Sequence, residues 1–403
     1  MPDKLFTNHQ GYLMISKRCL DLKPFYVMEI LERAKELEKK GGSIIHLEIG
    51  EPDFDTPECV KEAARQAMDR GETHYTHSLG IPELRQAVSR HYSKTYGAQV
   101  DPERIIVTAG TSPAMFMLFS ALLHPGEEVI ISDPHYACYP SFICFAGGKP
   151  VKIRVTQDNG FQLNPDIVRK RLTPLTKGIF INSPSNPTGN ITPAEILREL
   201  SGLGPYIISD EIYHGLVYKG KEHSILEFTD KAFVLNGFSK LYAMTGWRLG
   251  YIIAPKEFIR TLQIVHQNFF ISANSIAQWA GITALEQADE DVLRMRLIYN
   301  KRREYMLERL VRMGFGITVE PTGAFYILAN AGFLSDNSYE LAFDILDKAG
   351  VGVAPGIDFG QGAEGYLRFS YANSLENIRK GLDRLEEYVR IRGQQSLQTA
   401  AGK

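Results

Sequence analysis

The sequence predicts an α/β protein with a mainly parallel sheet between layers of helices, followed by a smaller α+β unit. From about residue 100, short β-branched runs alternate with helical stretches, which is the pattern of a parallel α/β sheet. These runs are continuously apolar rather than alternating, as expected for strands that are covered on both faces. The length of 403 residues is sufficient for two domains.

The first expected element is a helix over residues 27–40, which Gly41 and Gly42 end. Its apolar residues recur at helical spacing: Val27, Ile30, Leu31, Ala34 and Leu37. The predicted strands of the sheet are RIIVTAG (104–110), EVIISDP (128–134), GIFINSP (178–184), YIISDEI (206–212), AFVLNGF (232–238) and LGYIIAP (249–255). Helical stretches between them are expected at 113–123, 165–172 and 192–201.

The pattern changes again after about residue 285. A long charged helix is expected over residues 289–313, and further helices near 338–349 and 375–391. Short apolar or β-branched runs separate these helices: GITVE (316–320), AFYILA (324–329), VGVAP (351–355) and YLRFSYA (366–372). This mixture indicates a smaller α+β domain.

Composition and charge exclude several classes of protein. A net charge of −2 gives no electrostatic footprint for nucleic acid or for an anionic membrane. The longest apolar run, AMFMLFSALL (114–123), is too short to span a bilayer. The N-terminus, MPDKLFTNHQGYLMISKR, lacks the apolar core of a signal peptide. We therefore expect a cytoplasmic protein that binds neither membrane nor nucleic acid.

We expect no metal site. His74 and His77 have no third ligand nearby in the sequence. The cysteines lack paired spacing and are interpreted as reduced thiols that act as small hydrophobes: Cys19, Cys59, Cys138 and Cys144.

Several predicted strands lead into polar groups, which in a parallel sheet belong at the carboxyl ends of the strands. The run at 104–110 leads into Thr111 and Ser112 at the start of a helix, where free amides and the helix dipole favour a phosphate. Other runs lead into SNPTGN (185–190), into Asp210 with Tyr213, and into Lys240. We therefore expect five groups to meet at the carboxyl ends of the strands: a phosphate cradle, an amide, a carboxylate, a phenol and a lysine.

This set of groups fits pyridoxal phosphate (PLP). The aldehyde of PLP needs a lysine amine for a Schiff base, its pyridine nitrogen needs a carboxylate, and its phosphate needs amides, hydroxyls and an arginine. Lys240 stands in a weakly charged stretch, SKLYAMTGWRLGY (239–251), where burial would disfavour the charged amine and help it to act as nucleophile and base. Arg248 would supply a fixed charge for the phosphate.

The motifs SNPTGN, SDEIYHGLVY (209–218) and GFSKLYAMTGWRLGY (237–251), in this order, resemble the class I/II aminotransferases of the fold-type I PLP enzymes. IIHLEIGEPDFDTP (44–57) and THYTHSLGIPELR (73–85) resemble the bacterial and archaeal aspartate-aminotransferase subgroup. The resemblance covers roughly residues 20–390.

The resemblance implies a large PLP-binding α/β/α sandwich domain and a smaller α+β domain. We expect residues 49–285 to form the large domain and residues 286–403 the small C-terminal domain. Residues 1–48 are expected to form an N-terminal arm and helix that belong to the small domain.

The resemblance also implies a role for each matching residue around the PLP ring. Lys240 corresponds to the Schiff-base lysine, and Asp210 pairs with the pyridinium nitrogen. Asn186 and Tyr213 hydrogen-bond the phenolic oxygen of the ring. Tyr136, in SDPHYACY (132–139), stands where an aromatic residue stacks on the ring.

Further matching residues concern the phosphate and the substrate. Thr111, Ser112 and Arg248 are expected to hold the phosphate. Tyr75 resembles the tyrosine that reaches the phosphate of the neighbouring subunit, which implies a homodimer. The resemblance assigns the binding of the substrate α-carboxylate to two further residues, Arg368 through its guanidinium and Gly50 through its backbone amide.

Two positions depart from the family pattern. Gly237 stands where many relatives carry a serine that binds the phosphate, although Ser239 is close by. Ser112 stands where some aspartate-specific relatives carry a lysine, which argues against a strict preference for acidic donors.

The leading hypothesis is an aminotransferase that moves an amino group from an L-amino acid of aspartate, alanine or aromatic type to a 2-oxo acid such as 2-oxoglutarate, by a ping-pong mechanism. A PLP-dependent β-lyase (C–S lyase) or a cyclising synthase would share every PLP-binding residue, so these alternatives stay open. A transcriptional regulator on this fold would need a DNA-binding module, and only about 20 residues precede the region of resemblance. We do not expect a regulator.

Overall fold

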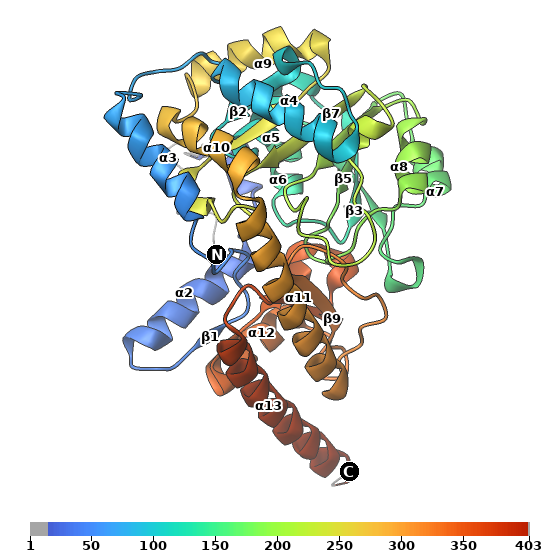
Figure 1. The fold of residues 1–403 in the computed structure, drawn as a ribbon. Helices are drawn as coiled ribbons and strands as arrows, with labels where there is room; N and C mark the ends of the chain where they lie inside the picture. The colour runs from blue at the N-terminus through green and yellow to red at the C-terminus, as the bar shows by residue number, and fades with distance from the viewer. Residues whose placement is uncertain (1–14, 402–403) are drawn as a thin grey trace, which may run out of the picture.

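The structure, a computed structural model, describes residues 15–401, so residues 1–14 of the expected N-terminal arm lie outside the described residues. Figure 1 shows a large sheet surrounded by helices in the upper part of the view, and below it a smaller part built from both ends of the described chain. A first short helix, α1 (Lys17–Leu20), precedes this arrangement. No helix within residues 15–401 combines the length and the apolar character needed to cross a membrane.

The large sheet has seven strands, and every neighbouring pair is parallel except those that involve β8. Their spatial order is β2 (Ile105–Thr108), β8 (Gly250–Ile253), β7 (Ala232–Gly237), β6 (Tyr206–Asp210), β5 (Thr176–Asn182), β3 (Glu128–Asp133) and β4 (Lys149–Arg154). The predicted, mainly parallel sheet is confirmed. The sequence did not indicate β4, because this edge strand is largely exposed and its residues, KPVKIR, form no continuous apolar run.

Helices cover both faces of the large sheet. Alternate residues of a strand enter different layers: Ile207 and Val234 pack in one apolar cluster, whereas Ile208 and Phe233 pack in the other. The first cluster includes side chains of α3 (Glu58–Asp69), α4 (Pro82–Tyr96), α7 (Pro165–Arg171), α8 (Ala194–Ser201) and α10 (Ser275–Gln287). The second includes side chains of α5 (Thr111–Leu122), α6 (Tyr139–Phe145) and α9 (Lys256–Phe269). Burial on both faces explains why the strand sequences are continuously apolar.

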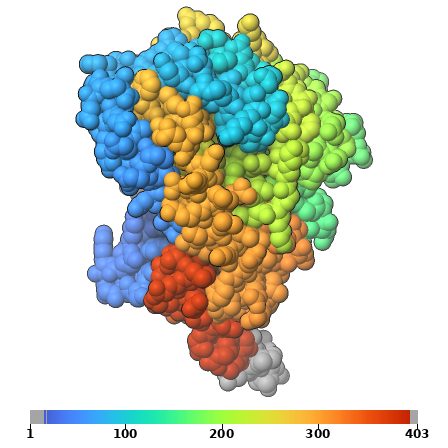
Figure 2. Space-filling model, viewed as in Figure 1, coloured from blue at the N-terminus to red at the C-terminus, as the bar shows by residue number. Residues whose placement is uncertain are grey.

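The smaller part joins segments that lie far apart in the sequence. β1 (Ile45–His46) pairs in parallel with β10 (Val351–Gly352), and a second, antiparallel sheet has the order β11 (Ala354–Pro355), β12 (Tyr366–Ser370), β9 (Tyr326–Asn330). Its helices are α2 (Tyr26–Lys39), α11 (Asp289–Arg312), α12 (Ser338–Ala349) and α13 (Leu375–Ala401). Figure 2 shows the blue segment of α2 and the orange and red segments of α11 and α13 gathered in the lower part of the molecule.

Not every run in the C-terminal region forms a strand. The run at 316–320 makes only an isolated bridge, between Gly316 and Asn330. The pairing of β1 with β10 brings the segment after α2 beside the C-terminal region, while the assignment of residues 1–48 to a small domain stays a prediction. The boundaries at residues 48/49 and 285/286 stay a prediction.

Six strands of the large sheet, all except β8, bring their carboxyl ends to one edge, and five of them lead into predicted site residues. β3, β4, β5, β6 and β7 run in the same direction, and β2 shares it because β8 is antiparallel to both β2 and β7. The five strands that lead into the site are β2, β3, β5, β6 and β7. The chain leaves these strands toward Thr111, Tyr136, Asn186, Asp210 and Lys240. The topology therefore gathers the predicted polar groups at a single edge.

Glu211 anchors the end of β6 and is completely buried. Its carboxylate oxygens accept hydrogen bonds from four donors: the hydroxyls of Tyr92, Ser209 and Ser224 and the backbone N–H of Ile225. Burial raises the pKa of the Glu211 carboxyl to about 8, although these donors oppose the shift. Because Glu211 directly follows Asp210, this cluster fixes the strand end that carries Asp210.

We expect Glu211→Ala to lower the free energy of unfolding by about 3 kcal/mol or more, because the buried donors lose their acceptor. Glu211→Gln copies the protonated carboxyl and should keep most of that stability. The pKa of the folded carboxyl, about 8, lies above the ordinary value of 4.5, so the wild type should lose stability as the pH rises through this interval, whereas the Gln variant should lose less. Urea unfolding at about pH 5.5, 7 and 8.5 measures this. A difference between the two proteins that is independent of pH would contradict the prediction.

Candidate active site

A cavity of about 350 Å³ lies at the carboxyl edge of the large sheet, where the sheet meets the smaller part of the molecule. Every residue that the sequence singled out for PLP or substrate, except Tyr75, lines this cavity. These residues are Gly50, Thr111, Ser112, Tyr136, Asn186, Asp210, Tyr213, Lys240, Arg248 and Arg368. Residues that are up to 318 positions apart in the sequence, from Gly50 to Arg368, thus share one site.

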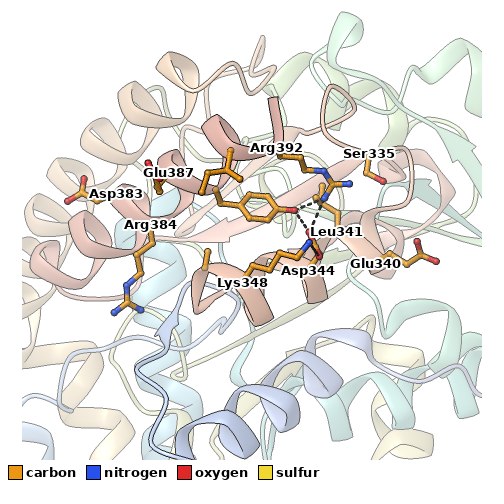
Figure 3. Close-up of a pocket in the computed structure, with 12 residues that line it drawn as sticks. Ser335, Glu340, Leu341, Asp344, Lys348, Asp383, Arg384, Glu387 and Arg392 are labelled. Atoms are coloured by element: carbon orange, nitrogen blue, oxygen red, sulfur yellow. Dashed lines mark hydrogen bonds and ion pairs between the residues drawn. The ribbon is translucent and has the colours of Figure 1, made fainter. Parts of the chain in front are cut away.

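A larger hollow, of about 880 Å³, lies between α12 and α13 and contains none of the predicted site residues. Figure 3 shows that charged side chains of its lining, Lys348 and Arg392, engage Asp344. The hydroxyl of Tyr388 donates to Asp344 Oδ2 over 2.5 Å, and Lys348 pairs with the same carboxylate at 2.7 Å. The chemistry of its lining, rather than its size, identifies the cavity at the sheet edge as the candidate site.

Lys240 follows β7 and points its amine into the cavity. Its Nζ donates a hydrogen bond to the backbone carbonyl of Gly50 over 2.6 Å. Burial lowers the pKa of the Lys240 amine to about 8, and the charge of Glu51 partly opposes this shift. A substantial fraction of the amine is therefore neutral, and nucleophilic, close to physiological pH.

Asp210, at the end of β6, is the buried carboxylate of the cavity. The hydroxyl of Tyr139 donates to its Oδ2 over 2.7 Å, and the backbone N–H of Ile212 donates to its Oδ1 over 3.2 Å. Burial raises the pKa of Asp210 to about 6, whereas both donors and the charge of Lys240 lower it. The carboxylate is thus held ionised at neutral pH by a small number of fixed partners.

Asn182, at the end of β5, connects Asp210 with Asn186. Its Nδ2 donates to the carbonyl of Asp210 over 3.0 Å, and its Oδ1 accepts from the backbone N–H of Asn186 over 2.8 Å. The sequence reasoning missed both Asn182 and Tyr139, although each lies within a few residues of a predicted site residue. Their contacts depend on the pairing of β5 with β6 and on the start of α6, which no local pattern specifies.

Tyr213 and Tyr136 form the aromatic surroundings of the cavity. The hydroxyl of Tyr213 lies 2.8 Å from that of Tyr326, and burial raises the pKa of the Tyr213 phenol well above its ordinary value. The ring of Tyr136 meets the ring of Phe25 edge to face, with 6.1 Å between the centroids. Both tyrosines therefore have fixed ring orientations.

Arg368, on β12, is held between two aromatic rings. Its guanidinium carbon lies 4.3 Å from the ring centroid of Tyr326 and 4.8 Å from that of Phe359. Its Nη1 donates to Asn186 Oδ1 over 3.0 Å, and its Nη2 donates to the backbone carbonyl of Glu48. Among the described residues, the buried Nε has no hydrogen-bond partner, so the guanidinium keeps donor capacity for an anion.

α5 begins with Thr111 and Ser112, which line the cavity, and no side chain of the described residues caps its first turn. Arg248 lies beside this turn, and its Nη1 donates to the carbonyl of Thr245 over 2.9 Å. Gly110, which precedes this turn, has a φ of 101°, a conformation that favours glycine, and a Cβ atom there would come within 2.6 Å of Arg248 Nη2 and displace the guanidinium. Uncapped amides and a guanidinium together form a cradle for an anion such as a phosphate.

The departure at Gly237 has a steric explanation. A Cβ atom at this position of β7 would lie 2.9 Å from both Gly250 Cα and the carbonyl oxygen of Leu249, which belong to the adjoining segment at β8. A serine would therefore force β7 and β8 apart. Ser239 does line the cavity.

Tyr75 lies outside the cavity and is 82% exposed. Its loop, which follows α3, is fixed to α9 and α10: Gln278 Nε2 donates to Thr76 Oγ1 over 2.9 Å, and Gln263 Nε2 donates to Ser78 Oγ over 3.0 Å. Within one chain, Tyr75 does not join the other predicted site residues.

Known proteins resemble the chain over nearly its full length. Residues 42–385 match the family Aminotransferase class I and II. One similar protein is the (5-formylfuran-3-yl)methyl phosphate transaminase of Methanocaldococcus jannaschii, which is 43% identical over 93% of this chain and 100% of its own length. Another is the aspartate/prephenate aminotransferase of Thermus thermophilus, which is 41% identical over 94% of this chain and 99% of its own length.

Solved structures agree with this likeness. The Thermus thermophilus aspartate aminotransferase with maleate superimposes with a TM-score of 0.89 at 41% identity, covering 93% of this chain and 99% of that one. A Methanococcus jannaschii protein, described as similar in its active site to kynurenine aminotransferases, gives a TM-score of 0.87 at 42% identity, covering 93% and 100% of the two chains. With its fold-type I architecture and a family match across most of its length, the chain belongs to the class I and II aminotransferases, a PLP-dependent family, and is an aminotransferase.

Proposed function

We propose that this aminotransferase binds PLP through Lys240 and moves the amino group of an L-amino acid to a 2-oxo acid, 2-oxoglutarate in the first instance, by a ping-pong mechanism. The observation that carries the proposal is that the amine of Lys240, the carboxylate of Asp210 and the guanidinium of Arg368 line one cavity. Relatives named as aspartate/prephenate and aspartate aminotransferases support this reaction class.

The side chains of the cavity fit PLP. The uncapped first turn of α5 and Arg248 suit its phosphate, and the buried carboxylate of Asp210 suits a protonated pyridine nitrogen. Tyr136 offers a ring face, and Asn186 and Tyr213 offer hydrogen-bonding groups for the phenolic oxygen. When bound, PLP supplies an electron sink that weakens the Cα–H bond of the substrate.

Lys240 is the group that would move the proton. With a pKa of about 8, its amine can take the proton from the substrate Cα and release it again at neutral pH. The phenol of Tyr139 and the amide of Ile212 keep the carboxylate of Asp210 oriented toward the cavity throughout. The donor and the acceptor reach the same groups in turn, which is the basis of ping-pong kinetics.

Arg368 would bind the α-carboxylate that donor and acceptor have in common. The rings of Tyr326 and Phe359 hold its guanidinium in one plane, and Asn186 fixes its Nη1. A planar guanidinium with an unpartnered Nε can present parallel N–H groups to a carboxylate. Gly50, whose backbone amide is the second group expected to bind this carboxylate, lines the same cavity.

We also propose that the active unit is a homodimer in which Tyr75 completes the site of the partner subunit. Apolar side chains are exposed around its loop: Phe269 is 66% and Ile271 is 49% exposed, at the end of α9 to which the loop is fixed. An apolar surface of this kind suits a second copy of the chain. A two-fold dimer would bring each Tyr75 to the other subunit.

Kinetics with both substrates varied should give parallel double-reciprocal lines, because a single site serves two half-reactions. The amount of amino acid formed should equal the amount of donor consumed. The Lys240→Ala variant provides the background rate. Intersecting lines, or free ammonia released in step with the 2-oxo acid, would instead indicate a β-lyase.

Borohydride reduction of the holoenzyme, followed by peptide mass mapping, should place the covalent PLP adduct on Lys240, and Lys240→Ala should form none. The rate at which the apoenzyme captures PLP should rise with pH around a midpoint near 8, because the neutral amine is the nucleophile. The absorbance change on mixing measures this rate. An adduct on another lysine, or a midpoint near the ordinary value of 10.5, would contradict the prediction.

Tyr75→Ala and Lys240→Ala proteins, each almost inactive, should complement each other after subunit exchange. Half of the dimers would then be mixed, each with one intact site and one doubly altered site, so activity should recover to about a quarter of the wild-type value. Differential tags verify that exchange has occurred. Tyr213→Ala mixed with Lys240→Ala is the matched control and should not recover, because both residues belong to the cavity of one chain. If mixed dimers of the first pair also stay inactive, Tyr75 does not act across the interface.

A further inference from the structure

One wall of the active-site cavity is apolar. We define the apolar wall as Phe25, Val27, Met28, Leu31 and Ile49, all of which line the cavity. Val27 and Leu31 are four residues apart on α2, so they lie on one face of the helix. Met28 is 45% exposed, which leaves apolar surface for a ligand to cover.

The charges of the cavity leave no group for a second carboxylate. Its basic side chains, among the described residues, are Lys240, Arg248 and Arg368. The proposed function engages Lys240 with the aldehyde of PLP and the Cα proton, Arg248 with the phosphate and Arg368 with the α-carboxylate. The remaining acidic side chain besides Asp210 is Glu51, which would repel a carboxylate on the donor side chain.

The apolar wall is held at a fixed position relative to Arg368. Asp358 accepts hydrogen bonds from the first amides of α2, from Tyr26 over 3.0 Å and from Val27 over 3.2 Å. Its neighbour Phe359, in the same short helix η5 (Gly356–Phe359), packs against the guanidinium of Arg368. A substrate bound by its α-carboxylate would therefore meet the wall at a defined distance.

The partner subunit would not supply the missing cation from the segments that accompany Tyr75. The loop at 72–78 and the segment at 268–275 contain no lysine or arginine. Two of the exposed residues there, Phe269 and Ile271, are apolar, and the others are Thr73, His74, Tyr75, His77, Asn268 and Asn274. In the proposed dimer, these segments would thus add no lysine or arginine for a second carboxylate.

We propose that the preferred amino donor carries an apolar side chain, best an aromatic one, and that Phe25 is the specificity-determining residue. This inference rests on the proposed function. The ring of Phe25 stands edge to face against Tyr136, so an aromatic donor would extend an existing cluster of rings. 2-Oxoglutarate carries its distal carboxylate one methylene further out than aspartate does, and so it can reach past the wall to solvent.

The test follows the donor half-reaction of the holoenzyme, without acceptor, by the absorbance of the cofactor. The apparent second-order rate constant should be at least about tenfold higher for L-phenylalanine than for L-aspartate. Phe25→Ala should lower the value for phenylalanine by about tenfold and change that for aspartate less than about threefold. Leu22→Ala, an exposed leucine outside this cavity, is the matched control and should change neither.

Binding of unreactive carboxylates separates recognition from chemistry. 3-Phenylpropanoate should bind the wild-type holoenzyme more tightly than succinate, and Phe25→Ala should remove the difference, whereas Phe25→Leu should keep part of it. A preference for aspartate and succinate would overturn the inference and leave the aminotransferase reaction intact. A holoenzyme that no L-amino acid converts would instead refute the proposed function.

Discussion

The active site depends on the burial of two groups that water would keep charged. Burial lowers the pKa of Lys240 and raises that of Asp210, so it drives both toward their neutral forms. For the carboxylate, the fold opposes this through the phenol of Tyr139 and the amide of Ile212. For the lysine, the charge of Glu51 opposes the shift in part, and the amine donates a hydrogen bond to the backbone carbonyl of Gly50. The result is a carboxylate that stays ionised and an amine that can give up its proton.

The chemistry at the strand ends could be predicted from the sequence because its signals are local. Asp210 and Lys240 follow apolar runs directly, and Thr111 opens a helix, so each position can be identified without knowledge of the fold. The parallel sheet was predictable for the same reason, whereas the exposed edge strand β4 was not. The role of each residue toward PLP, and the partner-subunit role of Tyr75, stay predictions.

The groups that orient the site were not predictable, because their contacts bridge distant segments. Tyr326 hydrogen-bonds to Tyr213, although the two residues are 113 positions apart. Tyr326 belongs to β9 in the antiparallel sheet of the smaller part. The ring of Phe359 packs against the guanidinium of Arg368, and Asp358 accepts a hydrogen bond from the start of α2. The sequence around these two residues contains no motif that indicates either contact. Steric constraints could not be predicted either. The glycine at position 237 is required by its close contact with Gly250, and this contact exists only because β7 pairs with β8.

The short helix η5 has a consequence for how this enzyme could change during evolution. Asp358 holds the start of α2, and the adjacent Phe359 supports Arg368. A substitution in η5 would disturb the recognition of every substrate. Arg368, which would bind the α-carboxylate, and α2, which faces the substrate side chain, would be displaced together. Substitutions on α2 itself would alter only one end. New donor preferences are therefore most accessible through the first turns of α2, while η5 is expected to diverge slowly.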